Sequence, residues 1–443
     1  MVWKNTLVPQ ALRDDFFRQF ARYWRVGADA LRALAPPSAT LQEQEELPPR
    51  IVWVDLPDWA RDLGVDGQHA GRLPIPAHIA PPSLEWRAVD WPLCGAWFMH
   101  CLAERAYEQQ YGPIHSYSFR LGGWPHEIWS RAWANRAALF LRRFAAAEYG
   151  KDEKALFGPL PEAEIFLTHD VDAVRKTMAI RCKQTVFSLC NAARALVDRQ
   201  GKKAWRCAKS AFSFFSSSGE NWHFSRIARL DEAYGLRSLF FLPGKKPATF
   251  LQSPRAWLFD PGYDPLACKK DLADLAMAGH AIGLHPAFDA WGDAEQLSDA
   301  KERLQRAVSM PVTDCRQHWL RFSFGATWEA QAAAGLKTDY TLGFNDRAGF
   351  RNGAAIRHEP LGTDGKPVAG FFSIPLVLMD SHLYDYAGNE QEDSLKRIKA
   401  LLDEVRCTRG QASILWHPHT IFEDYGWGGG YLDVLRELGT ITQ

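Results

Sequence analysis

The sequence predicts an α/β protein built on a distorted (β/α) barrel of about seven strands, with an N-terminal α/β extension and a basic helical insertion after the first barrel strand. Two observations support this fold class. From residue 164 onward, short apolar runs alternate with helix-like segments, and reactive polar side chains recur where those runs end. Alternating strands and helices favour a parallel sheet with right-handed crossovers, whose active sites lie at the carboxyl ends of the strands.

The bulk composition is that of a globular chain. Its 443 residues are enough for more than one domain, and its formal net charge of +0 gives no reason to expect a nucleic-acid partner. The eight Cys form no C-x-x-C pair, which excludes zinc-ribbon and redox motifs. We see no signal peptide and no apolar stretch of transmembrane length. We therefore expect a cytoplasmic protein, peripheral to the inner membrane if its basic insertion binds lipid, and we predict no oligomeric state.

Residues 1–160 are expected to form a separate α/β accessory domain, and residues 161–443 the barrel. Proline clusters divide the first part into short elements. Arg50–Asp55 predicts a strand, and Trp91–Glu108 and Trp124–Tyr149 predict helices.

The second part supplies the elements of the barrel. Seven strands are predicted, over Glu164–His169, Arg237–Leu242, His280–His285, Asp314–Leu320, Thr338–Leu342, Phe371–Leu378 and Ala412–His417. Helices are predicted between them, over Trp222–Tyr234, Lys269–Ala278, Asp293–Val308, Thr327–Ala334 and Glu390–Arg406.

The segment over residues 173–219 interrupts the alternation. It is a long helical insertion in which Asp198 is the only acid. Its basic residues are Arg175, Lys176, Arg181, Lys183, Arg194, Arg199, Lys202, Lys203, Arg206 and Lys209. Such a basic amphipathic stretch suits an anionic membrane surface or a phosphate-bearing substrate; the alternative interpretation is a solvated hairpin that covers the barrel.

Two carboxylates follow the first predicted barrel strand. Asp170 and Asp172 are two residues apart, so on extended backbone they project to the same side. Acids held this close repel each other unless a cation or a shared proton relieves them. The chemical interpretation is a metal ligand beside a base; the structural one is a solvated turn.

A histidine ends the third predicted strand. Asp289 follows His285 by about one helical turn, which would place both on one face. Imidazole and carboxylate together suit zinc or another transition metal. A lone His at a strand end is more often an ordinary polar residue, so this pair gains weight only from the carboxylates of the first strand.

Two later strands also carry polar residues. Arg316 and His318 share one face of the predicted strand over 314–320, where Arg316 could orient a carboxylate and His318 could bind metal or substrate. His417 ends the last strand and is placed to act as an acid toward a leaving group. Taken together, these strand ends favour a single site.

This order of residues resembles the polysaccharide deacetylase (NodB-homology) family of carbohydrate esterases. The resemblance covers roughly residues 164–420. It rests on Thr-His-Asp-Val-Asp at 168–172, on the Gly-His-x-Ile-Gly-Leu-His run at 279–285, on Arg316 and on Leu-Trp-His at 415–417. The pattern looks like a divergent subgroup associated with bacterial surface-polysaccharide biosynthesis.

The resemblance implies a metal-dependent hydrolase that removes an N-acetyl group from a sugar or glycan, free or lipid-linked. It implies Asp170 as the base, Arg316 as the residue that braces the base, and His417 as the acid. Two other functions stay open: a catalytically inactive glycan-binding or scaffold protein, and a metal-dependent hydrolase of another amide or ester.

The resemblance further implies a divalent metal ion, with zinc as the first expectation, bound by Asp172 and His285. The family's second metal-binding His is replaced here by Asp289. The third ligand is therefore either His318 or Asp289. We prefer His318, since it is expected on the strand face of Arg316.

Overall fold

A computed structural model of the chain describes residues 9–25, 28–34, 47–65, 67–197, 199–216, 223–246, 248–260, 262–385, 391–423 and 425–439. Four positions named in the predictions lie outside the described residues: Asp198, Gly219, Trp222 and Glu390.

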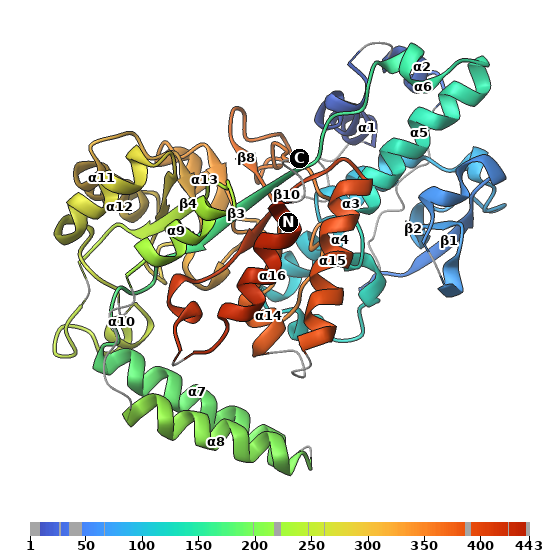
Figure 1. Cartoon of the computed structure of the whole chain (residues 1–443). Coiled ribbons are helices and arrows are strands. Elements are labelled where there is room, and N and C mark those ends of the chain that lie inside the picture. Colours follow the sequence, from blue (N-terminus) through green and yellow to red (C-terminus); the bar gives the residue numbers. More distant parts are fainter. Residues whose placement is uncertain are drawn as a thin grey trace. The chain divides into compact units, whose positions relative to one another are not determined.

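Eight strands form one curled sheet in the order β8-β7-β6-β5-β4-β3-β10-β9. Figure 1 labels β3, β4, β8 and β10 of this sheet. The eight strands are β3 (Glu164–Asp170), β4 (Leu239–Pro243), β5 (Ala281–His285), β6 (Asp314–Cys315), β7 (Thr338–Asp339), β8 (Phe372–Ser373), β9 (Leu376–Met379) and β10 (Gln411–Leu415). The pairs β3–β4, β4–β5, β5–β6 and β7–β8 are parallel. The predicted α/β class with a parallel, barrel-like sheet is confirmed.

The sheet has eight strands where about seven were expected, because the strand predicted over 371–378 is two strands. Only Ile374 and Pro375 separate β8 from β9, and Pro375 has no N–H to donate to a ladder. β8 pairs with β7, whereas β9 lies next to β10. Two consecutive strands thus stand at opposite ends of the strand order, and the sheet curls back toward itself.

The strand predicted over 314–320 is wrong in length, since β6 ends at Cys315. A short 3-10 turn follows over His318–Leu320, in which Trp319 has φ 57° and Leu320 has φ 48°. Left-handed backbone of this kind breaks an extended strand. Arg316 and His318 therefore do not share a strand face as expected.

The chain divides into two compact units. Unit 1 comprises Met1–Phe166, Trp319–Gly388 and Lys396–Ile414, and unit 2 comprises Leu167–His318, Asn389–Leu395 and Leu415–Gln443. Unit 1 therefore contains residues from both sides of the predicted boundary at 160. Whether residues 1–160 fold as a domain of their own stays a prediction.

Unit 1 has a largely aromatic core. Its helices include α1 (Pro9–Gln19), α3 (Trp91–Met99), α4 (Leu102–Tyr111), α5 (Trp133–Tyr149), α13 (Thr327–Ala333) and α14 (Asp380–Tyr384), and β1 (Ile51–Asp55) pairs antiparallel with β2 (Arg72–Pro76). Trp91 packs on Phe140 with ring centroids 4.9 Å apart. The helix predicted over 91–108 breaks at Cys101, which has φ 52°. Burial in this core accounts for many of the chain's tryptophans.

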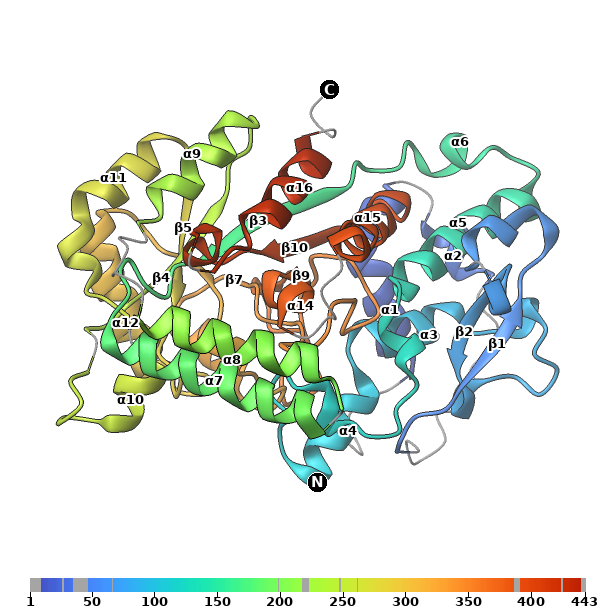
Figure 2. The same ribbon diagram turned by 60° about the horizontal axis from the view of Figure 1, so that its bottom comes forward.

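Unit 2 surrounds the exit of β3. Two antiparallel helices, α7 (Met178–Val197) and α8 (Gly201–Ser216), follow β3 and lie side by side in both views (Figures 1 and 2). The remaining helices include α9 (Ser225–Ala233), α10 (Pro254–Phe259), α11 (Lys269–Met277), α12 (Ala294–Val308) and α16 (Gly428–Gly439), while α15 (Gln391–Cys407) has residues in both units. Among the described residues, none of the helices combines the length and hydrophobicity needed to cross a bilayer.

Buried hydrogen bonds fix the register of β3 within unit 2. His169 is fully buried; its Nδ1 lies 2.8 Å from the Trp416 carbonyl and its Nε2 lies 3.0 Å from Asp231. Tyr431 and Ser238 also donate hydrogen bonds to Asp231. Because side chains alternate along a strand, anchoring His169 on one side turns its neighbours Thr168 and Asp170 to the other.

Candidate metal centre

The predicted site residues lie where strands of unit 2 end. Asp170 is the last residue of β3 and His285 is the last residue of β5. β4 runs between these strands, with Phe241 opposite Asp170 and Pro243 opposite His285. Parallel strands end on one edge of the sheet, so residues far apart in sequence meet there.

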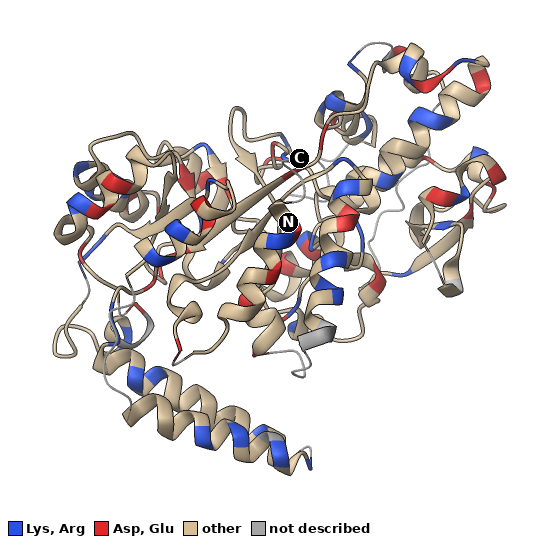
Figure 3. Ribbon diagram, in the orientation of Figure 1, with Lys and Arg blue, Asp and Glu red and all other residues tan. Residues whose placement is uncertain are grey.

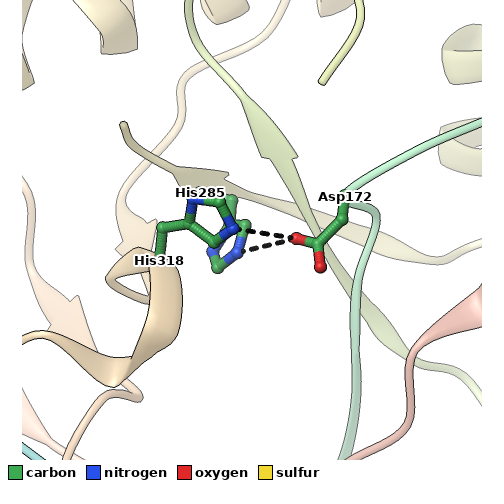
Figure 4. Close-up of side chains that lie close together, drawn as sticks. All are labelled: Asp172, His285 and His318. Atoms are coloured by element: carbon green, nitrogen blue, oxygen red, sulfur yellow. Dashed lines mark ion pairs between the residues drawn. The ribbon is translucent and has the colours of Figure 1, made fainter. Parts of the chain in front are cut away.

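Asp172, His285 and His318 form a cluster at this edge (Figure 4). The Asp172 Oδ1 atom lies 3.2 Å from His285 Nε2 and 3.6 Å from His318 Nε2. One candidate ligand atom from each residue lies within 4.8 Å of the other two. The structure thus brings together both residues predicted as ligands and the preferred third candidate.

The orientation of each imidazole is set by its other ring nitrogen. His285 Nδ1 lies 2.7 Å from the Arg316 carbonyl oxygen, which can only accept a hydrogen bond. His318 Nδ1 lies 2.8 Å from Asp260 Oδ1, a carboxylate oxygen. Both Nδ1 atoms must therefore carry the proton, so the neutral rings direct their Nε2 lone pairs toward Asp172.

These residues fit a divalent cation. Asp172 Oδ1 is buried and accepts no hydrogen bond, despite its 3.2 Å approach to His285. Converging lone pairs around an unsatisfied buried oxygen are costly unless a cation lies among them. One carboxylate and two imidazoles are a donor set for zinc or a similar transition metal, and the hydrogen bonds at both Nδ1 atoms are the outer support such ligands usually have.

The local electrostatics favour the metal-binding forms of two of the three side chains. Burial would raise the pKa of Asp172, but the imidazoles of His285, His318 and His417 hold that pKa well below its usual value. Burial lowers the pKa of His318, against the pull of Asp260 and Asp172. Burial would also lower the pKa of His285, yet Asp170 and Asp172 raise it. At His285 a proton therefore competes with a metal ion for Nε2.

Asp170 is held beside this cluster by Arg316. The guanidinium of Arg316, which is fully buried, donates from Nη1 to Asp170 Oδ1 at 3.1 Å and to Thr168 Oγ1 at 2.7 Å. It also lies 4.7 Å from the centre of the Phe241 ring. The other carboxylate oxygen, Asp170 Oδ2, lies 3.8 Å from His285 Nε2. Asp170 is thus a buried carboxylate with one fixed oxygen and one oxygen turned toward the cluster.

His417 and Asp289 occupy different surroundings. His417 Nε2 lies 3.8 Å from Asp172 Oδ2, and its side chain is 19% exposed, so it stands at the open side of the cluster. The Asp289 side chain is 56% exposed and pairs with Arg255 at 3.3 Å. Among the described residues the metal-binding group does not include Asp289.

Asp260 is a part of the site that sequence reasoning missed. It orients His318, accepts a hydrogen bond from the Phe288 N–H at 2.8 Å, and lies 3.7 Å from Lys245 Nζ. Burial would raise its pKa, but the hydrogen bond from His318 and the other contacts lower it. A small pocket opens here, with Lys245 and Lys246 in its lining. The sequence around residue 260 contains no motif from which this role could be predicted.

No protein-family model matches the sequence, and no curated protein matches it significantly. Solved structures with similar folds include a protein assigned as a polysaccharide deacetylase from Mycobacterium smegmatis, at 16% identity and a TM-score of 0.37, which covers 63% of this chain and 85% of that one.

Two further similar structures have 11% identity each. One is a CE4 domain of a multidomain xylanase from the hindgut metagenome of Trinervitermes trinervoides, with a TM-score of 0.29 and coverage of 63% of this chain and 84% of that one. The other is a CE4-family pseudoenzyme from Bacillus anthracis, with a TM-score of 0.28 and coverage of 63% and 62%. At such low identities and TM-scores, the chemistry has to be inferred from the side chains of this chain.

Proposed function

We propose that the protein is a metal-dependent, deacetylase-like hydrolase that removes an N-acetyl group from a sugar or glycan in bacterial surface-polysaccharide biosynthesis. The observation that supports it is the convergence of Asp172, His285 and His318 beside an Arg-braced Asp170. Hydrolysis of an unreactive amide needs both a metal-binding group and an oriented base. The choice of an N-acetylated sugar, free or lipid-linked, rests on the motif resemblance.

Each side chain has a role that its contacts allow. A divalent ion bound by Asp172, His285 and His318 would polarise the acyl carbonyl and lower the pKa of water. Asp170 accepts the water proton at Oδ2, because its Oδ1 already accepts from Arg316. His417, at the open side of the cluster, donates a proton from Nε2 to the departing amine.

The ligand geometry bears on the alternative that the chain is an inactive glycan-binding relative. The altered motif residue, Asp289, lies outside the cluster, but His318 supplies a third donor. The change from His to Asp at 289 therefore does not leave the group with only two ligands. For this reason we prefer the enzyme to the scaffold.

Metal analysis combined with deacetylation assays tests the proposal. Purified protein, as isolated and after loading with Zn²⁺, is analysed for bound metal and assayed for amine release from N-acetylated amino sugars and for acetate release from O-acetyl esters. We expect about one metal per chain, together with amine release. Metal without any turnover would favour the inactive relative, and turnover of esters alone would favour the other hydrolase.

A pair of matched variants tests the choice of third ligand. His318→Ala is expected to lose bound metal, whereas Asp289→Ala keeps it, because only His318 lies in the cluster. Loss of metal in Asp289→Ala with retention in His318→Ala would reverse the assignment.

A further inference from the structure

The α7–α8 hairpin has basic residues along both helices. One of them, Lys183, is not exposed, and the charges of Asp172 and Asp260 act on it. The two helices contain seven Lys and Arg residues, three in α7 and four in α8, and no Asp or Glu. Figure 3 shows blue along both helices and no red on them. The whole chain has a formal net charge of +0, so this positive charge is a local feature of the hairpin.

The same hairpin exposes large apolar side chains. Eight of the seventeen largely exposed large apolar residues in the described part of the chain lie in these two helices. They are Met178, Val186, Leu189, Leu196 and Val197 in α7, and Trp205, Phe212 and Phe215 in α8. Trp205 is 73% exposed and Phe212 is 78% exposed, which is unusual for side chains of this size. Clustered exposure of this kind marks a surface that meets an apolar partner.

The apolar residues form a stripe along each helix. In α7 the spacing 178, 186, 189, 196 keeps side chains on one side of the helix, and in α8 so does the spacing 205, 212. The side that faces the neighbouring helix is marked by Arg181 and Thr185, which hydrogen-bond to the backbone carbonyls of residues 215 and 211. At about 100° per residue, each stripe lies roughly a quarter turn from this contact side.

Both stripes lie on one face of the hairpin. Residue positions rotate clockwise along α7 and, seen from the same end, counter-clockwise along the antiparallel α8. A quarter turn from the contact side therefore leads to the same face in both helices. Exposed basic residues lie beyond each apolar stripe, further around the helix from the contact side. They are Arg194 in α7 and Lys202 and Lys209 in α8. The hairpin thus presents an apolar face with cationic flanks.

We propose that this face docks on the surface of an anionic lipid bilayer. Apolar side chains would enter the boundary between headgroups and acyl chains, while Lys and Arg reach the lipid phosphates. A second copy of the chain fits this face poorly, because a two-fold contact would bring two acid-free basic surfaces together. The proposal does not depend on the function proposed above.

Docking in this way would keep the metal centre near the membrane. α7 begins at Met178, six residues after Asp172, which limits the separation to about 20 Å of extended chain. A substrate carried by a lipid could then reach Asp172 without leaving the bilayer surface.

Vesicle co-sedimentation of the full-length protein tests the proposal. The probes are vesicles of phosphatidylcholine alone and vesicles containing phosphatidylglycerol, each at low and high salt. We expect binding only to the anionic vesicles, and at least tenfold weaker binding at high salt, since screening shortens the reach of the charges.

Two variants separate the contributions. The charge variant Lys202→Gln/Arg206→Gln/Lys209→Gln is expected to bind at least tenfold more weakly. The apolar variant Trp205→Ser/Phe212→Ser should lose binding to a similar degree. The matched control is Leu251→Ser/Met277→Ser, which removes two even more exposed apolar side chains outside the hairpin and should bind like the native protein.

Three results would overturn the proposal. In the first, the native protein fails to bind anionic vesicles. In the second, the hairpin variants bind as well as the control. In the third, the native protein dimerises with rising concentration, and the apolar variant loses this dimerisation while its lipid binding is unchanged. The last result would make the face a contact between copies.

Discussion

The buried ion pairs of unit 1 and the candidate metal centre of unit 2 balance their charges in different ways. In unit 1, Arg351 donates from Nε to both carboxylate oxygens of Glu104 at 3.2 Å, and Arg136 pairs with Glu404 at 2.7 Å. In each of these two pairs a buried carboxylate meets a guanidinium, and the donors of one group match the acceptors of the other. These contacts are complete within the protein.

In unit 2 the candidate metal centre brings together buried atoms that can all act as hydrogen-bond acceptors. Asp172 Oδ1 has no geometrically satisfied hydrogen bond. Nδ1 of His285 and of His318 carries a proton, so in the neutral rings both Nε2 lone pairs point at this oxygen. Buried acceptors that converge need either a metal ion or a proton between them, and at His285 the two compete. Matched donors and acceptors need nothing further.

The largest effect is expected from Asp170→Asn. The amide keeps the size of the side chain but cannot accept the water proton, so turnover should fall by on the order of 10²–10⁴ while the bound metal stays at the native level. Steady-state kinetics and metal analysis measure the two quantities. Asp289→Asn makes the same chemical change at an exposed carboxylate and should alter neither. Joint loss of metal and activity in Asp170→Asn would instead make Asp170 a ligand.

Breaking a completed pair in unit 1 should cost stability rather than chemistry. Arg351→Met leaves Glu104 buried without its guanidinium, and the free energy of unfolding should fall by about 3–5 kcal/mol. Adding Glu104→Met to this variant should restore much of the loss, because neither charge of the pair is then left buried without its partner. Denaturant unfolding of the single and double variants measures this. A double variant no more stable than the single would contradict the explanation.

The outer support of the cluster should have an intermediate effect. Asp260→Ala removes the carboxylate that orients His318, and metal affinity should weaken by roughly 10–100-fold. Competition with a chromogenic chelator measures the affinity. Asp264→Ala, which removes a neighbouring carboxylate paired with Arg303, is the control and should bind metal normally. Equal weakening in both variants would point to a general loss of structure.

The last expected effect builds up gradually with pH and concerns a histidine of unit 1. Burial lowers the pKa of His358 to about 3, with His100 adding to the shift, whereas an unfolded histidine has a pKa near 6.5. The contribution of neutral, buried His358 to the free energy of unfolding is fully present above pH 6.5. It falls as the pH drops toward 3, because only the unfolded state takes up the proton, at about 1.4 kcal/mol per pH unit.

Unfolding experiments between pH 7 and 4 test this slope. His358→Gln removes the titrating group, so its free energy of unfolding should decline less steeply with falling pH than that of the native protein. The absolute stability of the variant does not matter for this comparison. Parallel slopes in the two proteins would show that His358 does not titrate as proposed.

The parts of the fold that could be predicted are those decided by local pattern. β3 and β5 end at or within one residue of their predicted limits, because apolar runs closed by polar residues define a buried strand. Asp172 and His285 meet as expected, since parallel strands carry their ends to a common edge. Pro375 divided a predicted strand in two, although its missing N–H is visible in the sequence.

The parts that could not be predicted depend on contacts between distant segments. The early end of β6 follows from left-handed backbone at Trp319 and Leu320, residues that do not usually adopt it. Asp260 is 88 residues from Asp172 in sequence, and only the folded chain brings it to His318. His318 was expected on a strand face and reaches the cluster from a turn instead.

Arg316 makes two contacts in the site, and only one of them depends on its side chain. Its guanidinium holds Asp170, but the contact to His285 is made by its backbone carbonyl, which every amino acid possesses. A substitution at position 316 would release Asp170 and leave the imidazole aligned. On the mechanism proposed above, a relative that lost Arg316 would lose turnover before it lost the bound ion. Bound metal in such a relative would then not be evidence that the relative is an active enzyme.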